Sequence, residues 1–198
     1  MSASELKSAP LMLSARLLEA ALLAVQDAIS DDPTRMALGR VCVTVGEKCI
    51  TFTSTDGHRL HAVEIDKIEA DTLPLGRWHA EPEEIRKAIA LAKIAKGRKG
   101  APDVDSALLV IPESAAGFIF PEWSRVVPAK EEVNAGKAPS VNPLYLADAC
   151  AAAAKLKAPM VRIQTGDDHA ALLVTAAPAP DAWARAVRFT AVVMPMRT

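Results

Sequence analysis

The stretch that decides the fold runs over residues 40–65 and reads RVCVTVGEKCITFTSTDGHRLHAVEI. Apolar and polar residues alternate through three short runs, which is the period of β-strands with one buried face. Turn-forming residues separate the runs: GEK follows the first, and Asp56-Gly57 follows the second. The stretch therefore predicts three consecutive antiparallel strands. His58 and Arg59 come directly after the second turn, and the simplest interpretation of them is a pair of solvated turn residues.

A helical pattern precedes these strands. Apolar residues recur at helical spacing from Ser14 to Ile29, and Ser14 is a suitable N-cap. The short apolar run APLML before the helix predicts a strand. The first unit of the chain therefore reads strand, helix and three strands.

The same order of elements recurs twice more. A second unit opens with GRWHAEP, where Pro82 suits the first helical position and Gly97 suits the end of the helix. ALLVI and GFIF follow as short strands, so this unit has a shortened or missing strand. A third unit opens with APSVNP, with Asn142 as N-cap and Pro143 as the first helical residue. The segments MVRIQT, AALLVT and VRFTAVVMPM then predict three strands.

Three units that are each too small to bury their own helix predict an α+β fold in which the units share antiparallel sheet and the helices lie on one face. The segment AKEEVNAGKAPS between the second and third units is polar and rich in turn formers. We therefore expect a first domain of two units over residues 1–130, a linker over 131–138 and the third unit over 139–198.

Composition narrows the class of protein. The 198 residues are 51% hydrophobic and 24% charged with a net charge of −1, as in a soluble globular protein. No apolar run approaches the roughly 20 residues of a membrane helix, and the N-terminus lacks the order of a secretory signal. Three cysteines in apolar surroundings predict buried, reduced thiols and a cytoplasmic location. No motif predicts a metal site or a cofactor.

Five short segments resemble the bacterial DNA polymerase III beta subunit, the sliding clamp. They are DPTRMAL at 32–38, TDGHRL at 55–60, PEWSRVVP at 121–128, NPLYLADA at 142–149 and VVMPMR at 192–197. Each segment alone is a weak match, but all five occur in the order of that family. Together they extend the resemblance from about Pro10 to Arg197.

The resemblance implies a DNA-clamp fold of repeated β-α-β-β-β units. In that family each domain holds two units, each chain has three domains, and two chains close a ring around duplex DNA with helices lining the hole. This sequence shows three units, which resemble the middle domain and the second half of the last domain. Closure of a ring by the family's usual pairing does not follow from these units.

The resemblance also implies a pocket that binds short peptide motifs of client proteins. The interpretation places His58 and Arg59 at its rim and Leu60, Val126, Val192 and Met194 at its floor. Without the resemblance to this family, the Met-Pro-Met tail would be interpreted as a last edge strand that fills a gap in the core. The full set of expected pocket residues is Leu38, Thr55, Gly57, His58, Arg59, Leu60, Pro121, Val126, Asn142, Tyr145, Val192, Met194, Pro195, Met196 and Arg197.

A contact with duplex DNA is a further expectation. Four cations lie at the end of the predicted second helix: Lys93, Lys96, Arg98 and Lys99. They could contact DNA phosphates without recognising the base sequence. The alternative is that these cations complement the dipole of the helix C-terminus.

Two hypotheses for the function remain open, and neither involves catalysis or a cofactor. In the first, the chain is a clamp-like processivity factor that binds duplex DNA and tethers polymerase or other clients. A homo-oligomer is the form that this hypothesis allows for. In the second, it is a non-encircling adaptor or competitor that binds clamp-motif peptides. No nucleophile elbow or phosphate-binding loop accompanies His58 or Ser124, so the sequence does not favour an enzyme.

Overall fold

The computed structural model describes residues 9–67, 75–96, 107–111, 120–127, 139–165, 170–177 and 186–196. Its elements are β1 (Ala9–Leu13), α1 (Ala15–Gln26), β2 (Val41–Val45), β3 (Cys49–Thr55), β4 (Arg59–Asp66), β5 (Gly76–Ala80), α2 (Pro82–Lys96), β6 (Ala107–Ile111), the 3-10 helix η1 (Trp123–Arg125), α3 (Pro143–Lys155), β7 (Arg162–Gln164), β8 (Leu172–Ala176) and β9 (Val187–Val193). The predicted α+β class is confirmed.

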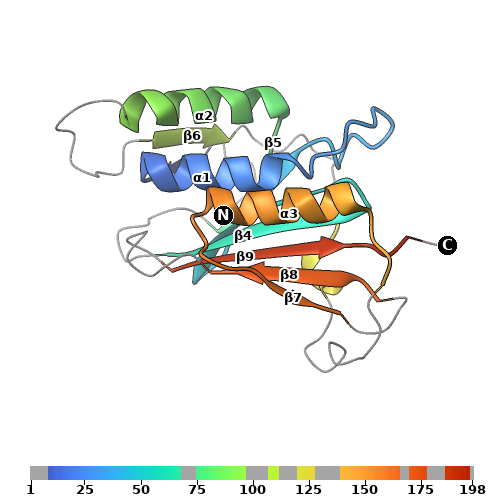
Figure 1. Cartoon of the computed structure of the whole chain (residues 1–198). Helices are drawn as coiled ribbons and strands as arrows, with labels where there is room; N and C mark the ends of the chain where they lie inside the picture. Colours follow the sequence, from blue (N-terminus) through green and yellow to red (C-terminus); the bar gives the residue numbers. More distant parts are fainter. Residues whose placement is uncertain are drawn as a thin grey trace.

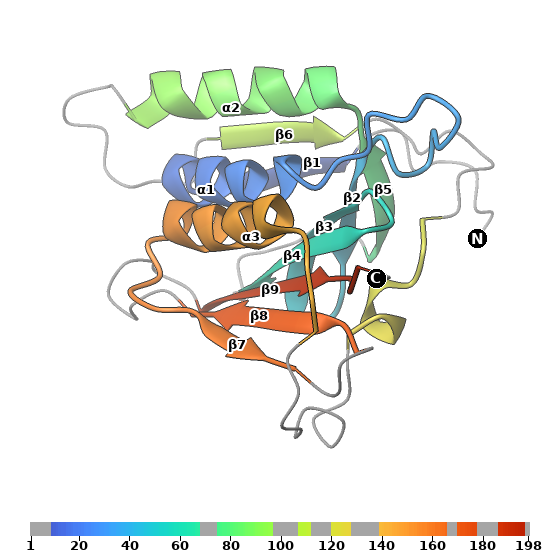
Figure 2. The same ribbon diagram turned by 45° about the vertical axis from the view of Figure 1, so that its right-hand side comes forward.

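Seven antiparallel strands form the main sheet in the order β5-β2-β3-β4-β9-β8-β7. The three strands expected over residues 40–65 are its centre, and their register places Phe52 opposite both Val43 and Val63. The helices lie on one side of this sheet, with α1 between α2 and α3 (Figures 1 and 2). The expected arrangement of helices on one face of antiparallel strands is therefore confirmed.

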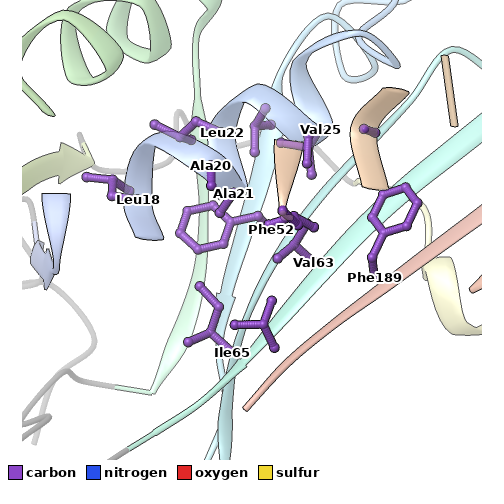
Figure 3. Packing of buried hydrophobic residues seen from close by; sticks show 14 of the residues in the cluster. Leu18, Ala20, Ala21, Leu22, Val25, Phe52, Val63, Ile65 and Phe189 are labelled. Atoms are coloured by element: carbon purple, nitrogen blue, oxygen red, sulfur yellow. The ribbon is translucent and has the colours of Figure 1, made fainter. Parts of the chain in front are cut away.

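The main core lies between α1 and the helix-facing side of the sheet. Leu18, Leu22, Phe52, Ile65 and Phe189 are almost completely excluded from solvent there. Figure 3 shows the ring of Phe52 next to Ala21 of α1, with the ring of Phe189 farther to the right in the same core. Side chains alternate along each strand, so the odd-numbered residues of β4 face this core and its even-numbered residues face the other side.

The ends of α1 are set by side chains. Ser14 accepts a hydrogen bond from the backbone N–H of Leu17, as the N-cap interpretation expects. The helix ends at Gln26, before the expected Ile29. Two of its last carbonyl groups accept hydrogen bonds from the sheet: Ser54 donates to the carbonyl of Val25, and His61 Nδ1 lies 2.9 Å from the carbonyl oxygen of Ala24. Side chains from the strands thus replace the next turn of helix.

The first two units exchange their first strands. β1 of the first unit pairs with β6 of the second, whereas β5 of the second unit pairs with β2 of the first. The first unit is also joined to the third, because β4 pairs with β9 over seven residue pairs from Arg59↔Val193 to Ile65↔Val187. The expected linker at 131–138 lies outside the described residues, and the division into domains stays a prediction.

Some expectations need correction. The strand expected before the third helix is reduced to one isolated bridge between Val141 and Pro195. The GFIF segment lies mostly outside the described residues. Of the three cysteines, Cys42 is buried, but Cys49, the first residue of β3 after the turn, and Cys150 on α3 are only half-buried. Burial raises the pKa of the Cys42 thiol to about 11.

Among the described residues, no helix is long and apolar enough to cross a bilayer.

Candidate functional site

The face of the sheet that points away from the helices carries a second, smaller apolar cluster. Leu60, Ala62, Leu173 and Val192 form it, and each is at most 7% exposed. The segment over residues 120–127, which includes η1, packs against this cluster through Trp123 and Val127. Figure 2 shows this segment beside the C-terminal end of β9, on the side of the sheet opposite the helices.

A cavity of about 190 Å³ opens where the segment meets the sheet. Its volume is below the roughly 300–1,000 Å³ of sites for whole small molecules, so it suits one or two apolar side chains. Its walls come from the α1–β2 loop, the β3–β4 hairpin, the segment at 120–127 and the end of β9. The lining residues are Leu38, Thr55, Gly57, Arg59, Leu60, Pro121, Trp123, Val126, Val192 and Met194.

Most of the predicted pocket residues lie in this lining. His58, Asn142, Tyr145, Pro195 and Met196 do not line the cavity but lie beside it, and Arg197 is outside the described residues. Leu60 and Val192 form its buried floor, as expected, whereas Val126 is 37% exposed and belongs to the rim. The expected set omits Trp123, although its aromatic side chain in the middle of the matched segment PEWSRVVP was a signal for it.

The β3–β4 turn is held by its own side chains. One carboxylate oxygen of Asp56 accepts hydrogen bonds from the backbone N–H groups of His58, at 2.8 Å, and Arg59, at 2.9 Å. Thr55 Oγ1 donates to the carbonyl of Arg59 and accepts from the N–H of Gly57. Gly57 has a φ of +91°, which L side chains rarely adopt. The Asp-Gly pair therefore fixes the direction in which His58 and Arg59 leave the turn.

Arg59 connects the hairpin to α3. Its Nε donates to Asp56 Oδ2 at 3.0 Å, and its Nη1 donates to Asp148 Oδ2. The guanidinium carbon lies 4.8 Å from the ring centre of Tyr145, a cation–π distance. The side chain is only 14% exposed, so this cation forms a fixed wall of the cavity. The ring of His58 is exposed and stacks against the ring of Tyr145, with the two ring centres 6.3 Å apart.

The loop that carries Leu38 is fastened to the same hairpin. Arg35 Nη1 donates to the carbonyl of Asp56 at 3.1 Å, and Arg35 Nε lies 3.5 Å from Asp32 Oδ2. The backbone N–H of Leu38 donates to the carbonyl of Arg35 at 2.8 Å. A Cβ on Gly57 would lie 2.8 Å from Arg35 Nη1, so the glycine also permits this close approach.

The opposite wall is fastened to β5. Arg77 donates to Glu122 at 3.0 Å, and this hydrogen bond lowers the pKa of the Glu122 carboxyl. Phe120 is buried and its ring lies 6.2 Å from that of His79. Burial and the nearby arginines Arg40 and Arg77 lower the pKa of His79, so its neutral form is favoured under this wall.

The C-terminal end of the described chain lies along the hairpin. The N–H of Met194 donates to the carbonyl of His58 at 2.9 Å, and the N–H of Met196 donates to the carbonyl of Ser140 at 2.7 Å. Met194 is half-buried and Met196 is 55% exposed, so these methionines do not fill a gap in the main core. Asn142 caps α3 by accepting from the N–H of Leu144, which explains its place beside the cavity.

The cations expected to meet DNA are only partly described. Lys93 is exposed on α2, and Lys96 is the last residue of that helix. Arg98 and Lys99 lie outside the described residues. On α3, Lys155 donates to Asp27 and to the carbonyl of Leu23, so it joins two helices and does not extend into solvent.

The described residues contain no group of three or more His, Cys, Asp or Glu side chains that could hold a metal ion. What the arrangement offers chemically is an apolar hollow with a fixed cation, a hydroxyl and an exposed imidazole at its edge. Such a combination binds a partner by burial and orients it by a few polar contacts.

Comparisons of sequence and structure differ in outcome. No protein-family model and no curated protein sequence matches this chain. Solved structures do match it over its whole length. A DNA polymerase sliding clamp from Pseudomonas aeruginosa, determined with a ligand, has a TM-score of 0.70 at 16% identity, and the match covers 70% of that chain.

Two further structures agree. The DNA polymerase III beta subunit of Thermotoga maritima has a TM-score of 0.65 at 13% identity, and 70% of it is covered. The beta sliding clamp of Caulobacter crescentus, with polyethylene glycol at its candidate beta-motif tethering region, has a TM-score of 0.68 at 18% identity, and 68% of it is covered. The whole of this chain is covered in each match. The fold implied by the sequence resemblance is therefore confirmed, and the chain is a structural relative of the DNA polymerase III beta subunit, the sliding clamp.

Proposed function

We propose that this protein is a clamp-like factor that binds clients through the cavity on the outer face of its sheet. The observation that carries the proposal is the meeting of distant segments, from Leu38 to Met194, around one apolar cavity in a chain with the sliding-clamp fold. The occupant is a short linear peptide of a polymerase or another client, with an apolar side chain in the cavity. The protein itself has no catalytic role.

The arrangement of apolar residues at the floor and polar residues at the edge supports a peptide ligand. Burying one large apolar side chain against Leu60 and Val192 contributes about 1.5–3 kcal/mol. The thioether of Met194 adapts to side chains of different shape. Arg59, Thr55 and the exposed His58 supply polar groups at the edge, where a peptide backbone or a polar side chain would be oriented.

The second part of the proposal is contact with duplex DNA without sequence recognition, as in a clamp that keeps polymerase on its template. Lys93 on α2 is the described cation that supports it. The alternative of a non-encircling adaptor or competitor of clamp–client interactions draws support from α3, whose exposed positions carry no charge. Binding to a fluorescent duplex over a range of salt concentrations separates these alternatives, since phosphate contacts give a steep salt dependence.

The test of the pocket is binding of a fluorescent clamp-motif peptide, measured by anisotropy. Val126→Asp adds a charge at the exposed rim, so it should reduce affinity about tenfold or more while the fold is retained. The matched control is Met160→Asp, which adds the same charge at a position 75% exposed and outside this cavity. Equal affinity of both variants for the peptide would contradict the proposed pocket.

A further inference from the structure

The C-terminal segment brings oxidisable side chains to the candidate site. Of the six methionines in the sequence, Met194 and Met196 flank Pro195. Met194 lines the cavity and is half-buried, whereas Met196 lies beside the cavity and is 55% exposed. A small oxidant in solution can therefore reach the side chain of Met194 without unfolding of the chain.

The backbone holds Met194 in place at the cavity. Its N–H donates to the carbonyl of His58 at 2.9 Å, and the N–H of Met196 donates to the carbonyl of Ser140 at 2.7 Å. Pro195 between them forms the bridge to Val141. Because the segment is fastened on two sides, a chemically altered Met194 side chain stays at the wall of the cavity.

The polar groups around the cavity have few donors to offer to an added oxygen atom. Thr55 Oγ1 already donates to the carbonyl of Arg59 at 2.7 Å. Arg59 donates through Nε to Asp56 and through Nη1 to Asp148. The floor of the cavity is apolar. An oxygen atom on the sulfur of Met194 would therefore lie in a largely apolar setting where the nearby donors are engaged.

We propose that Met194 is a reversible oxidation site, at which hydrogen peroxide weakens client binding. Peroxide transfers one oxygen atom to the sulfur: the O–O bond breaks, an S=O bond forms, the sulfur loses two electrons and water is released. Methionine sulfoxide reductases reverse the change with electrons from thiols, and the oxygen leaves as water.

The proposal rests on the proposed peptide pocket and adds regulation to it. In the reduced state, the flexible thioether packs against apolar side chains of different shape. In the oxidised state, an apolar side chain of the client would cover a polar sulfoxide oxygen and remove it from water without supplying a hydrogen bond. Oxidation therefore removes part of the apolar wall and adds a cost of desolvation at the same position.

Exposure alone does not identify this site, because other methionines are more exposed. Met160 is 75% exposed and Met36 is 64% exposed, and neither lines this cavity. Both should form sulfoxides in peroxide, but without an effect on the client. The position of Met194 in the cavity wall is what links its oxidation to binding.

The first experiment compares peptide affinity before and after oxidation of the full chain. Hydrogen peroxide is applied until mass spectrometry of proteolytic fragments shows a sulfoxide at Met194, and affinity for the fluorescent clamp-motif peptide is measured by anisotropy. The native chain should lose affinity about tenfold or more. Treatment with the two sulfoxide reductases and a thiol should restore it.

Leucine variants assign the effect to one residue. In Met194→Leu, peroxide should change the affinity by less than about twofold, whatever the affinity before treatment. Met196→Leu, two residues along the same segment, and Met160→Leu are the matched controls and should lose affinity on oxidation as the native chain does. Protection by Met196→Leu in place of Met194→Leu would overturn the proposal.

The outcomes separate this inference from the proposed function. An untreated chain that does not bind the peptide would contradict the proposed function itself. A chain that binds the peptide equally well before and after oxidation of Met194 would overturn only the regulation. Denaturation curves of the oxidised chain should still show a cooperative transition, and a loss of binding that comes from unfolding would overturn the proposal as well.

The second experiment measures protection by the client. A saturating concentration of the peptide should slow oxidation of Met194, because the occupant covers this wall of the cavity. The rate at Met160 should stay the same, since this residue lies outside the cavity. Equal rates at Met194 with and without bound peptide would show that the client does not contact this side chain, and the proposal would be wrong.

Discussion

The two faces of the main sheet are built from the same strands, but one face forms the main core and the other carries the candidate binding cavity. On the helix side, Phe52 and Phe189 are fully buried in one continuous core. On the outer side, Leu60 and Val192 belong to a small buried cluster of four residues, and they line a cavity. Because alternate residues of β4 face opposite sides, one strand contributes to stability and to the candidate site at the same time. The difference teaches that substitutions one residue apart should separate folding from binding.

The largest expected effect comes from the helix side. Phe52→Ala should lower the free energy of unfolding by about 3–5 kcal/mol, because it opens a space in the main core. Leu60→Ala, on the outer side beside an existing cavity, should lower it by about 2 kcal/mol, at the small end for such a change. Chemical denaturation measures both values. Leu60→Ala should also weaken peptide binding, and equal losses of stability in the two variants would contradict the distinction between the faces.

Arg59 is where the two faces are connected, and the next effect tests that connection. Arg59→Ala leaves Asp56 and Asp148 without their shared cation and removes a wall of the cavity. We expect a loss of about 1–3 kcal/mol in the free energy of unfolding together with weaker peptide binding. Arg77→Ala, which removes a more exposed ion pair to Glu122, is the comparison and should cost about 0–1 kcal/mol. Similar stability of the two variants would show that Arg59 does not hold the hairpin to α3.

The sequence predicts some of this architecture because it depends on local patterns. Alternation over residues 40–65 is enough for β2, β3 and β4, and Ser14 and Asn142 indicate where two helices begin. The exchange of β1 and β5 between units is not a local property, since it depends on which strands find each other in the folded chain.

The candidate site divides in the same way. The motifs identify most of its lining, but the partner of Arg59 on α3 is 89 positions away and no local pattern indicates it. Burial of Trp123 against the outer cluster likewise depends on the path of the segment over residues 120–127. The half-burial of Cys49 could not be inferred from its apolar neighbours, because it depends on where the strand begins.

The smallest expected effect is a dependence of stability on pH that comes from the helix side. His61 is buried beneath α1, donates through Nδ1 to the carbonyl of Ala24 and lies edge-on to Phe189, and burial lowers its pKa below the ordinary 6.5. The unfolded chain therefore takes up a proton that the folded chain excludes once the pH falls below about 6.5. The stabilisation is complete above that pH and is lost as the pH falls, by up to about 1.4 kcal/mol per pH unit for one histidine.

Denaturation curves between neutral and mildly acidic pH measure how the free energy of unfolding changes with pH. His61→Gln should make this change smaller. Part of the pH dependence should persist in the variant, because the pKa of His79 is lowered as well. A slope that His61→Gln leaves unchanged would contradict the burial of this ring beneath α1.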